Sequence, residues 1–166
     1  MKIDLLIIDA NVLIDFCKTD VSILALVTKH VGTVHVAEPV LAEVKQLDRA
    51  AAEGLGLRIV QAEYALLTQA ANAGVRSPLG FQDWLCLLLA KQESWTCVTN
   101  DKRLRTECET HAVSVLWGLQ LLLRLVEHGA LRADRAIELV RAIHAVNRRL
   151  PKDVVAVFTR QVKALR

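Results

Sequence analysis

The chain has 166 residues, enough for one domain with a substantial core, and 53% of them are apolar, which excludes long disordered segments. No apolar stretch reaches the roughly 20 residues that span a bilayer. Asp4, Asp9 and Asp15 interrupt the apolar N-terminal stretch, so a secretory signal is not expected. These features predict a cytoplasmic protein without a membrane segment.

The net charge of +3 is unevenly distributed, because residues 132–166 carry nine Lys and Arg against three Asp and Glu. A basic C-terminal segment fits a polyanionic partner, and it fits an ordinary solvated helix face nearly as well. The cysteines form no C-x-x-C pair and have no neighbouring histidines at zinc-site spacing, which favours buried free thiols. They are Cys17, Cys86, Cys97 and Cys108.

Apolar runs of strand type and helix type alternate along residues 1–130. The β-branched run Ile3 to Ile8 is typical of a buried parallel strand, and helices are expected from Asn11 to Cys17 and from Val21 to His30. Later strands are expected at residues 33–37, 57–60, 95–99 and 113–116, and later helices from Pro39 and over residues 63–73, 81–91, 102–111 and 118–127. This alternation predicts a three-layer α/β/α sandwich with a central, mainly parallel sheet.

Residues 131–166 contain two helical patterns, 131–150 and 153–165, with no strand between them. Apolar side chains on one side of the first helix suit packing on the body or across a dimer, and they are Ile137, Val140, Ile143 and Val146. We therefore expect a domain over residues 1–130 and a helical extension over 131–166, packed on that domain or on a dimer partner.

Two acidic residues follow predicted strands. Asp9 ends the first strand and Asp101 ends the fourth, and ligands of open α/β sheets bind outside the carboxyl ends of the strands. A carboxylate there can hold a cation or act as a base. Alternatively, Asp9 or Asn11 caps the helix that follows.

Two further acidic residues lie on predicted helices. Glu43 falls on the core stripe of the helix that begins at Pro39, next to Val44 and one turn from Val40, and a buried carboxylate there needs a cation or a donor. Asp83 interrupts a nearly all-apolar helix. The alternatives are that Glu43 reaches solvent at the edge of the stripe, and that Asp83 pairs with the helix dipole.

A right-handed α/β layout allows all four acids to converge at one edge of the sheet. Carboxylates held close together raise one another's pKa unless a cation intervenes. Mg²⁺ or Mn²⁺ suits such oxygen ligands, and one or two ions would position an attacking water and stabilise the leaving oxygen of a phosphodiester.

The four stretches that contain these acids resemble, in order and separation, the four conserved blocks of PIN domains. Each block alone is a weak signal, and four in sequence are fairly specific. The resemblance covers about residues 1–125, on the stretches Leu6-Ile-Ile-Asp9-Ala-Asn-Val-Leu-Ile, Pro39-Val-Leu-Ala-Glu43-Val, Gln82-Asp83-Trp-Leu-Cys-Leu-Leu-Leu-Ala and Val98-Thr99-Asn-Asp101-Lys-Arg-Leu.

The resemblance implies a Mg²⁺- or Mn²⁺-dependent endoribonuclease acting on single-stranded RNA, frequently the toxin of a toxin–antitoxin pair with an antitoxin partner, and commonly a homodimer. Such toxins usually end soon after the last strand, whereas this chain continues with residues 131–166. The implied metal-binding and catalytic acids are Asp9, Glu43, Asp83 and Asp101.

Other positions match the family pattern or flank it. Thr99 matches a hydroxyl residue that orders the site, and Asn11 matches a polar neighbour of the first acid. Lys102, Arg103 and Arg105 follow Asp101 and can meet backbone phosphates, although a solvated helix face explains them equally well. We therefore expect Thr99 in the catalytic set, and Asn11 and the three cations in nucleic-acid binding.

Two other functions are compatible with the pattern. The body can be an inactive PIN-like scaffold whose residues 132–166 dock a partner, and metal-dependent cleavage of RNA separates this hypothesis from the nuclease. An aspartyl-phosphate enzyme or receiver domain also places acids at strand ends, but Asp9-Ala-Asn lacks the second Asp expected two residues after an aspartyl nucleophile.

Overall fold

The computed structural model describes residues 4–165, and within them five strands form an all-parallel sheet in the order β3-β2-β1-β4-β5. The strands are β1 (Asp4–Ile8), β2 (Gly32–Ala37), β3 (Arg58–Val60), β4 (Thr96–Val98) and β5 (Val115–Leu116). The strand order reverses between β1 and β4, so a crevice opens at their carboxyl ends.

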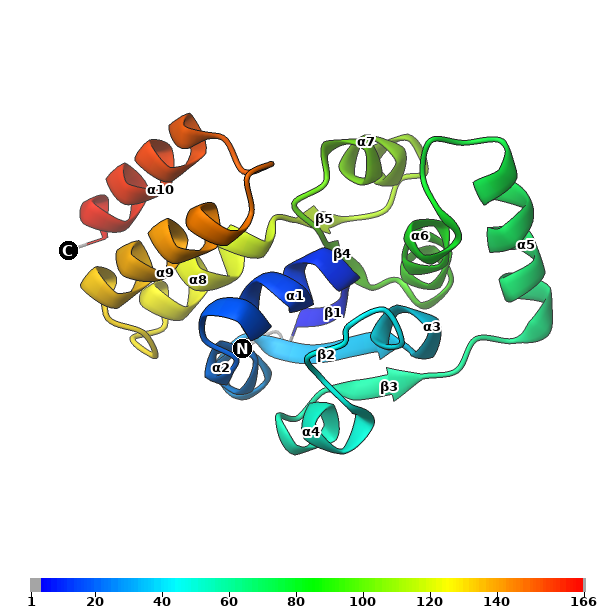
Figure 1. Cartoon of the computed structure of the whole chain (residues 1–166), viewed down its shortest axis with the longest axis horizontal. Helices are drawn as coiled ribbons and strands as arrows, with labels where there is room; N and C mark the ends of the chain where they lie inside the picture. Colours follow the sequence, from blue (N-terminus) through cyan, green and yellow to red (C-terminus); the bar gives the residue numbers. More distant parts are fainter. Residues whose placement is uncertain (1–3, 166) are drawn as a thin grey trace.

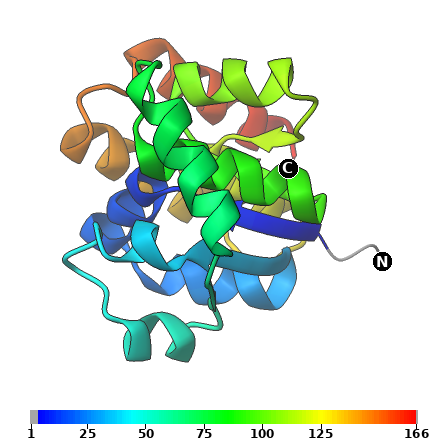
Figure 2. The same ribbon diagram turned by 90° about the vertical axis from the view of Figure 1, so that its right-hand side faces the viewer.

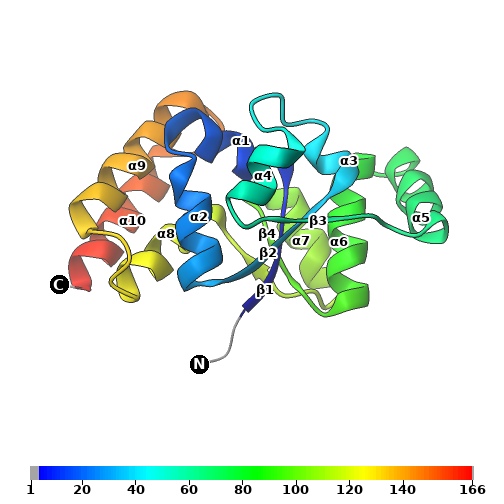
Figure 3. The ribbon, with the colours of Figure 1, turned by 90° about the horizontal axis from the view of Figure 1, so that it is seen from below.

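Helices cover both faces of the sheet (Figure 3). The helices on one face are α1 (Ala10–Thr19), α2 (Ser22–His30) and α8 (Gly118–Glu127), and those on the other are α6 (Phe81–Glu93) and α7 (Lys102–Thr110). This arrangement confirms the predicted three-layer α/β/α sandwich with a parallel sheet.

Three more helices surround this body. Figure 2 shows α5 (Tyr64–Val75) lying across the outer side of α6. The short helices α3 (Glu38–Leu41) and α4 (Arg49–Gly54) lie beside the end of the sheet formed by β2 and β3. No helix among residues 4–165 combines the length and the apolar character that crossing a membrane requires.

The central strand β1 sets the position of the first acidic residue. Leu6, Ile7 and Ile8 are fully buried, because helices cover the strand on both sides. Ile8 pairs with Val98 of β4, and the Asp9 amide continues this ladder by donating a hydrogen bond to the Val98 carbonyl at 3.2 Å. Asp9 is therefore held beside the end of β4.

The segment after β2 differs from its prediction. The helix that begins at Glu38 ends at Leu41, so Glu43 lies in an exposed turn and not on the core-facing side of a helix. The expected apolar residues Val40 and Val44 are nevertheless buried. The chain turns through short-range bonds, such as the one from the Val44 amide to the Leu41 carbonyl at 2.9 Å, which close a tighter turn than the α-helix.

Residues after α8 form two helices, α9 (Ala133–Val146) and α10 (Lys152–Ala164), on the outer side of α1 and α8 (Figure 1). The first is shorter than the pattern 131–150 indicated. Ile137, Val140 and Ile143 are buried, whereas Val146, which was expected on the same apolar face, is exposed at the end of the helix.

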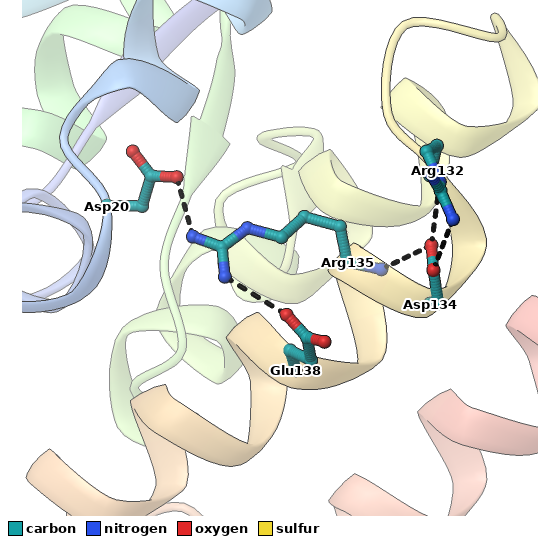
Figure 4. A network of polar contacts seen from close by, with 5 residues as sticks. All are labelled: Asp20, Arg132, Asp134, Arg135 and Glu138. Atoms are coloured by element: carbon teal, nitrogen blue, oxygen red, sulfur yellow. Dashed lines mark hydrogen bonds and ion pairs between the residues drawn. The ribbon is translucent and has the colours of Figure 1, made fainter.

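Polar contacts join α9 to the body at both ends. Figure 4 shows the Arg135 guanidinium, which donates to Asp20 at 3.0 Å and to Glu138 at 3.2 Å. At the other end, Asn147 Nδ2 donates to Asp15 Oδ2 at 3.0 Å. Asp15 is a buried residue of α1, so the second contact is shielded from solvent, whereas the first is at the surface.

Candidate active site

Two of the predicted acids cap helices at the crevice between β1 and β4. The Asp9 carboxylate accepts a hydrogen bond from the Val12 amide at 2.9 Å, and the Asp101 carboxylate accepts one from the Leu104 amide at 3.0 Å. Asp9 is therefore the N-cap of α1 and Asp101 the N-cap of α7. Capping leaves Asp9 Oδ2 and Asp101 Oδ2 for other contacts.

Thr99 connects these two acids. Its side chain is fully buried, and its hydroxyl donates to Asp9 Oδ2 at 2.5 Å. The hydroxyl oxygen of Thr99 in turn accepts a hydrogen bond from the Asp101 amide at 3.0 Å. One hydroxyl therefore bonds both the first acid and the backbone of the last.

Asp83 lies in the first turn of α6, facing the end of β1. Its Oδ2 accepts a hydrogen bond from the Gly80 amide at 3.1 Å. Burial raises the pKa of the Asp83 carboxyl, and the nearby Asp101 carboxylate raises it further.

Glu43 reaches the same place from the turn after α3. Together with Asp9 and Asp83 it lines a cavity of about 200 Å³, and Cys86 is also part of the lining. Although the residue is exposed, partial burial and the Asp83 carboxylate raise the pKa of the Glu43 carboxyl. Asp101 lines a second, adjoining cavity, and Asn11 lines both cavities.

Asp9 is the most deeply buried of the four acids, with 2% of its surface exposed. Burial raises the pKa of its carboxyl to about 7, with further increases from Asp83 and Asp101, against the opposing hydrogen bonds from Thr99 and Val12. A carboxyl of this kind is only partly ionised at neutral pH. A cation in the cavity would favour its ionised form.

The chemistry of the donors fits a hard divalent cation, since they are carboxylate oxygens of Asp9, Glu43, Asp83 and Asp101 gathered at one crevice. Among residues 4–165, no three His, Cys, Asp or Glu side chains are already arranged as a metal site. Of these four acids, Glu43 lies in an exposed turn and Asp83 is half-buried.

The residues expected to bind nucleic acid lie close to these acids. Asn11 is exposed in the first turn of α1, and Lys102 and Arg103 are exposed in the first turn of α7. Lys102 and Arg105 line a second cavity beside Asp101, whereas Arg103 does not.

Two residues outside the predicted set, Asp15 and Lys18, line the second cavity together with Asn11. Burial raises the pKa of the Asp15 carboxyl by more than Asn147, Lys18 and Asn100 lower it. Helical spacing was the available signal, because Asn11, Asp15 and Lys18 are four and three residues apart and share one face of α1.

Comparison with protein families identifies the family of this chain. A family model for the PIN domain matches residues 5–164, which is nearly the whole chain and includes α9 and α10. A search of curated proteins found no match.

Proposed function

Because this chain belongs to the PIN-domain family, whose members are generally nucleases, we propose that it is a Mg²⁺- or Mn²⁺-dependent endoribonuclease that hydrolyses phosphodiester bonds of single-stranded RNA. The observation that carries the proposal is the hydrogen-bonded chain from Asp9 through the Thr99 hydroxyl to Asp101 at the crevice. Asp83 and Glu43 bring two more carboxylates to the same crevice.

Asp9, Asp83 and Asp101 would hold the metal, and Glu43 would complete its ligands or orient the attacking water. A bound divalent ion supplies two effects, a lowered pKa for the attacking water and neutralisation of charge on the reacting phosphate. The buried Thr99 hydroxyl keeps the Asp9 carboxylate turned toward the crevice. The Asp101 amide, bound to the same hydroxyl, keeps the N-terminus of α7 in place.

Cations next to the acids would bind the substrate backbone. Lys102 and Arg103 are exposed one and two residues after Asp101, and contacts from such side chains to phosphates carry no sequence information. Hydrolysis assisted by a metal needs no covalent nucleophile, and it needs no particular nucleobase beside the cleaved bond. We therefore expect weak sequence preference in the reaction.

The decisive experiment compares three helix-capping aspartates in a cleavage assay. Full-length protein is incubated with labelled single-stranded RNA in Mg²⁺, in Mn²⁺ and in EDTA. Asp9→Asn and Asp101→Asn are expected to lose roughly 100-fold or more of the metal-dependent activity. Asp48→Asn is the matched control, because Asp48 caps α4 through the Ala51 amide at 2.7 Å, away from the crevice, and asparagine caps equally well.

A wild-type protein that cleaves no single-stranded RNA with either metal would overturn the proposal and favour an inactive PIN-like scaffold. Equal activity of all three variants would place the chemistry elsewhere. The toxin role, the antitoxin partner, the homodimer and the cytoplasmic location stay predictions that this assay does not address.

A further inference from the structure

A second cavity, of about 570 Å³, lies between the body and the C-terminal helices. It is formed by one face of α1, the start of α7, Trp117 and the segment from Val146 to Val154 that joins α9 to α10. We call it the extension groove. In Figure 1 the loop after α9 reaches from the helical layer toward α7.

We infer that the extension groove binds the nucleotides next to the cleaved phosphate, so that the loop between α9 and α10 forms one wall of the substrate site. The inference rests on the proposed nuclease function and extends it to a part of the chain with no assigned role.

Position is the first argument. Asp101 and Asn11 line the extension groove, and Asn11 also lines the cavity of Asp9, Glu43 and Asp83. The two cavities therefore meet at Asn11, where a strand whose phosphate lies at the acids can enter the groove. The volume lies within the range of roughly 300–1,000 Å³ typical of ligand sites.

Charge is the second argument. Four cationic side chains line the groove against the two carboxylates of Asp15 and Asp101, and they are Lys18, Lys102, Arg105 and Arg149. Within residues 4–165, none of these four has an acidic partner within 4.0 Å, whereas Arg124 and Arg135 do. Cations without an acidic partner keep their charge available to phosphates, and a concave wall concentrates their field.

The third argument is that a cationic side chain of the groove is preorganised. Arg105 Nη1 donates to the Asn100 carbonyl at 2.6 Å, and its guanidinium lies 3.6 Å from the centre of the Trp117 ring. Both contacts hold the cation in place before a substrate arrives, so little side-chain entropy remains to be lost. Pro151 and Val154 add apolar surface that suits a base.

Hydrogen bonds hold the loop between α9 and α10, which forms the wall, in place. Asn147 anchors it to buried Asp15, and the Arg149 amide donates to Asn147 Oδ1 at 3.1 Å. His144 Nδ1 lies 2.7 Å from the Leu150 carbonyl, and Leu150 is buried. These contacts place Arg149 in the lining of the groove, whereas its exposed neighbour Arg148 does not line it.

This difference provides matched variants. Arg149→Gln and Arg148→Gln each remove one charge from adjacent positions of the same turn, and only the first changes the groove. Binding of a fluorescein-labelled single-stranded RNA of mixed sequence is measured by anisotropy in EDTA, where no hydrolysis occurs. Arg149→Gln is expected to weaken binding about tenfold and to lower the salt slope by about 0.7, while Arg148→Gln leaves both near wild type.

A second pair guards against local disruption of the turn. Lys18→Gln in the last turn of α1 changes the groove, and Lys29→Gln in the last turn of α2 removes an exposed charge outside it. Lys18→Gln should weaken RNA binding and Lys29→Gln should not. Thermal unfolding of all four variants confirms that the fold is retained.

Wild-type protein that binds and cleaves RNA, with both groove variants indistinguishable from their controls, overturns the inference and leaves the nuclease function standing. Wild-type protein that neither binds nor cleaves RNA contradicts the nuclease function and, with it, the inference. Polyglutamate that displaces the RNA at equal charge concentration would also overturn the assignment to nucleotides, because bases would then contribute nothing.

Discussion

The hydroxyl of Thr99 donates to the carboxylate of Asp9 at 2.5 Å, although 90 residues separate them in the chain. Both residues are buried, and the contact crosses from the end of β4 to the end of β1. It opposes the effect of burial on the Asp9 carboxyl, since this hydrogen bond lowers the pKa that burial raises.

Replacement of Thr99 tests this contact. Thr99→Val keeps the shape of the side chain but leaves the buried Asp9 oxygen without its donor. We expect a loss of about 1–3 kcal/mol in the free energy of unfolding, measured in urea, and a sharp fall in cleavage. Thr99→Ser retains the hydroxyl and should keep most of the activity, and equal activity of the two variants would contradict a positioning role for the hydroxyl.

The raised pKa of Asp9 predicts a dependence of stability on pH. In the folded protein without metal this pKa is about 7, against 3.8 in the unfolded chain. Between these values the folded state binds more protons, so the contribution of Asp9 to the free energy of unfolding falls as pH rises and is lowest above about pH 7. Asp15, Asp83 and Glu43 act in the same direction, because their pKa values are also raised.

Urea unfolding in EDTA at about pH 5 and about pH 8 measures this dependence. The wild type should lose stability between the two, and Asp9→Asn, which does not titrate, should lose less. Mn²⁺ should restore stability mainly at the higher pH, because it binds the ionised carboxylates. A wild type that loses no more stability toward pH 8 in EDTA than Asp9→Asn would rule out a buried, protonated Asp9.

The two polar contacts of α9 should differ in strength. Asn147 donates to buried Asp15, and its loss leaves a desolvated carboxylate, so a double-mutant cycle of Asn147→Ala and Asp15→Ala should give a coupling of about 0.5–3 kcal/mol. The cycle of Arg135→Ala and Asp20→Ala at the surface should give a smaller coupling, because solvent screens the pair. Urea unfolding measures both cycles, and the reverse order would contradict the role of burial.

Gly118, the first residue of α8, lies where α1 and the loop after β4 meet. A Cβ there would lie 2.9 Å from Val12 Cγ1 and 3.0 Å from Asn100 Nδ2, so Gly118→Ala must displace Val12 of α1 and crowds the side chain of Asn100, which precedes Asp101. We expect a loss of about 1–3 kcal/mol in stability, measured by thermal unfolding, and reduced cleavage.

Gly54→Ala is the control for this substitution. Gly54 ends α4, and no atom beyond its own helix and neighbours lies within 4 Å of a Cβ built there, so alanine should be neutral or stabilise by about 0.5–1 kcal/mol. Similar losses at both positions would show that the close approach at Gly118 has no special effect.

The sequence by itself determined the order of strands and helices and the positions of three acids. Hydrophobic periodicity, helix caps and strand ends are local properties that a short stretch of sequence reveals. Asp9 and Asp101 could therefore be placed at the carboxyl ends of strands, and Asp83 at the start of a buried helix. The alternation of elements then restricted the sheet to a parallel one, because short crossovers allow few other topologies.

Only the tertiary structure decided the rest. Helical periodicity placed Glu43 on a helix, but the apolar spacing of Val40 and Val44 is satisfied equally well by a turn, and the surrounding packing selects the turn. The links from Thr99 to Asp9 and from Asn147 to Asp15, and the groove beside them, join segments 90 and 132 residues apart. Such contacts depend on which surfaces meet in the folded chain, and local spacing carries no information about that.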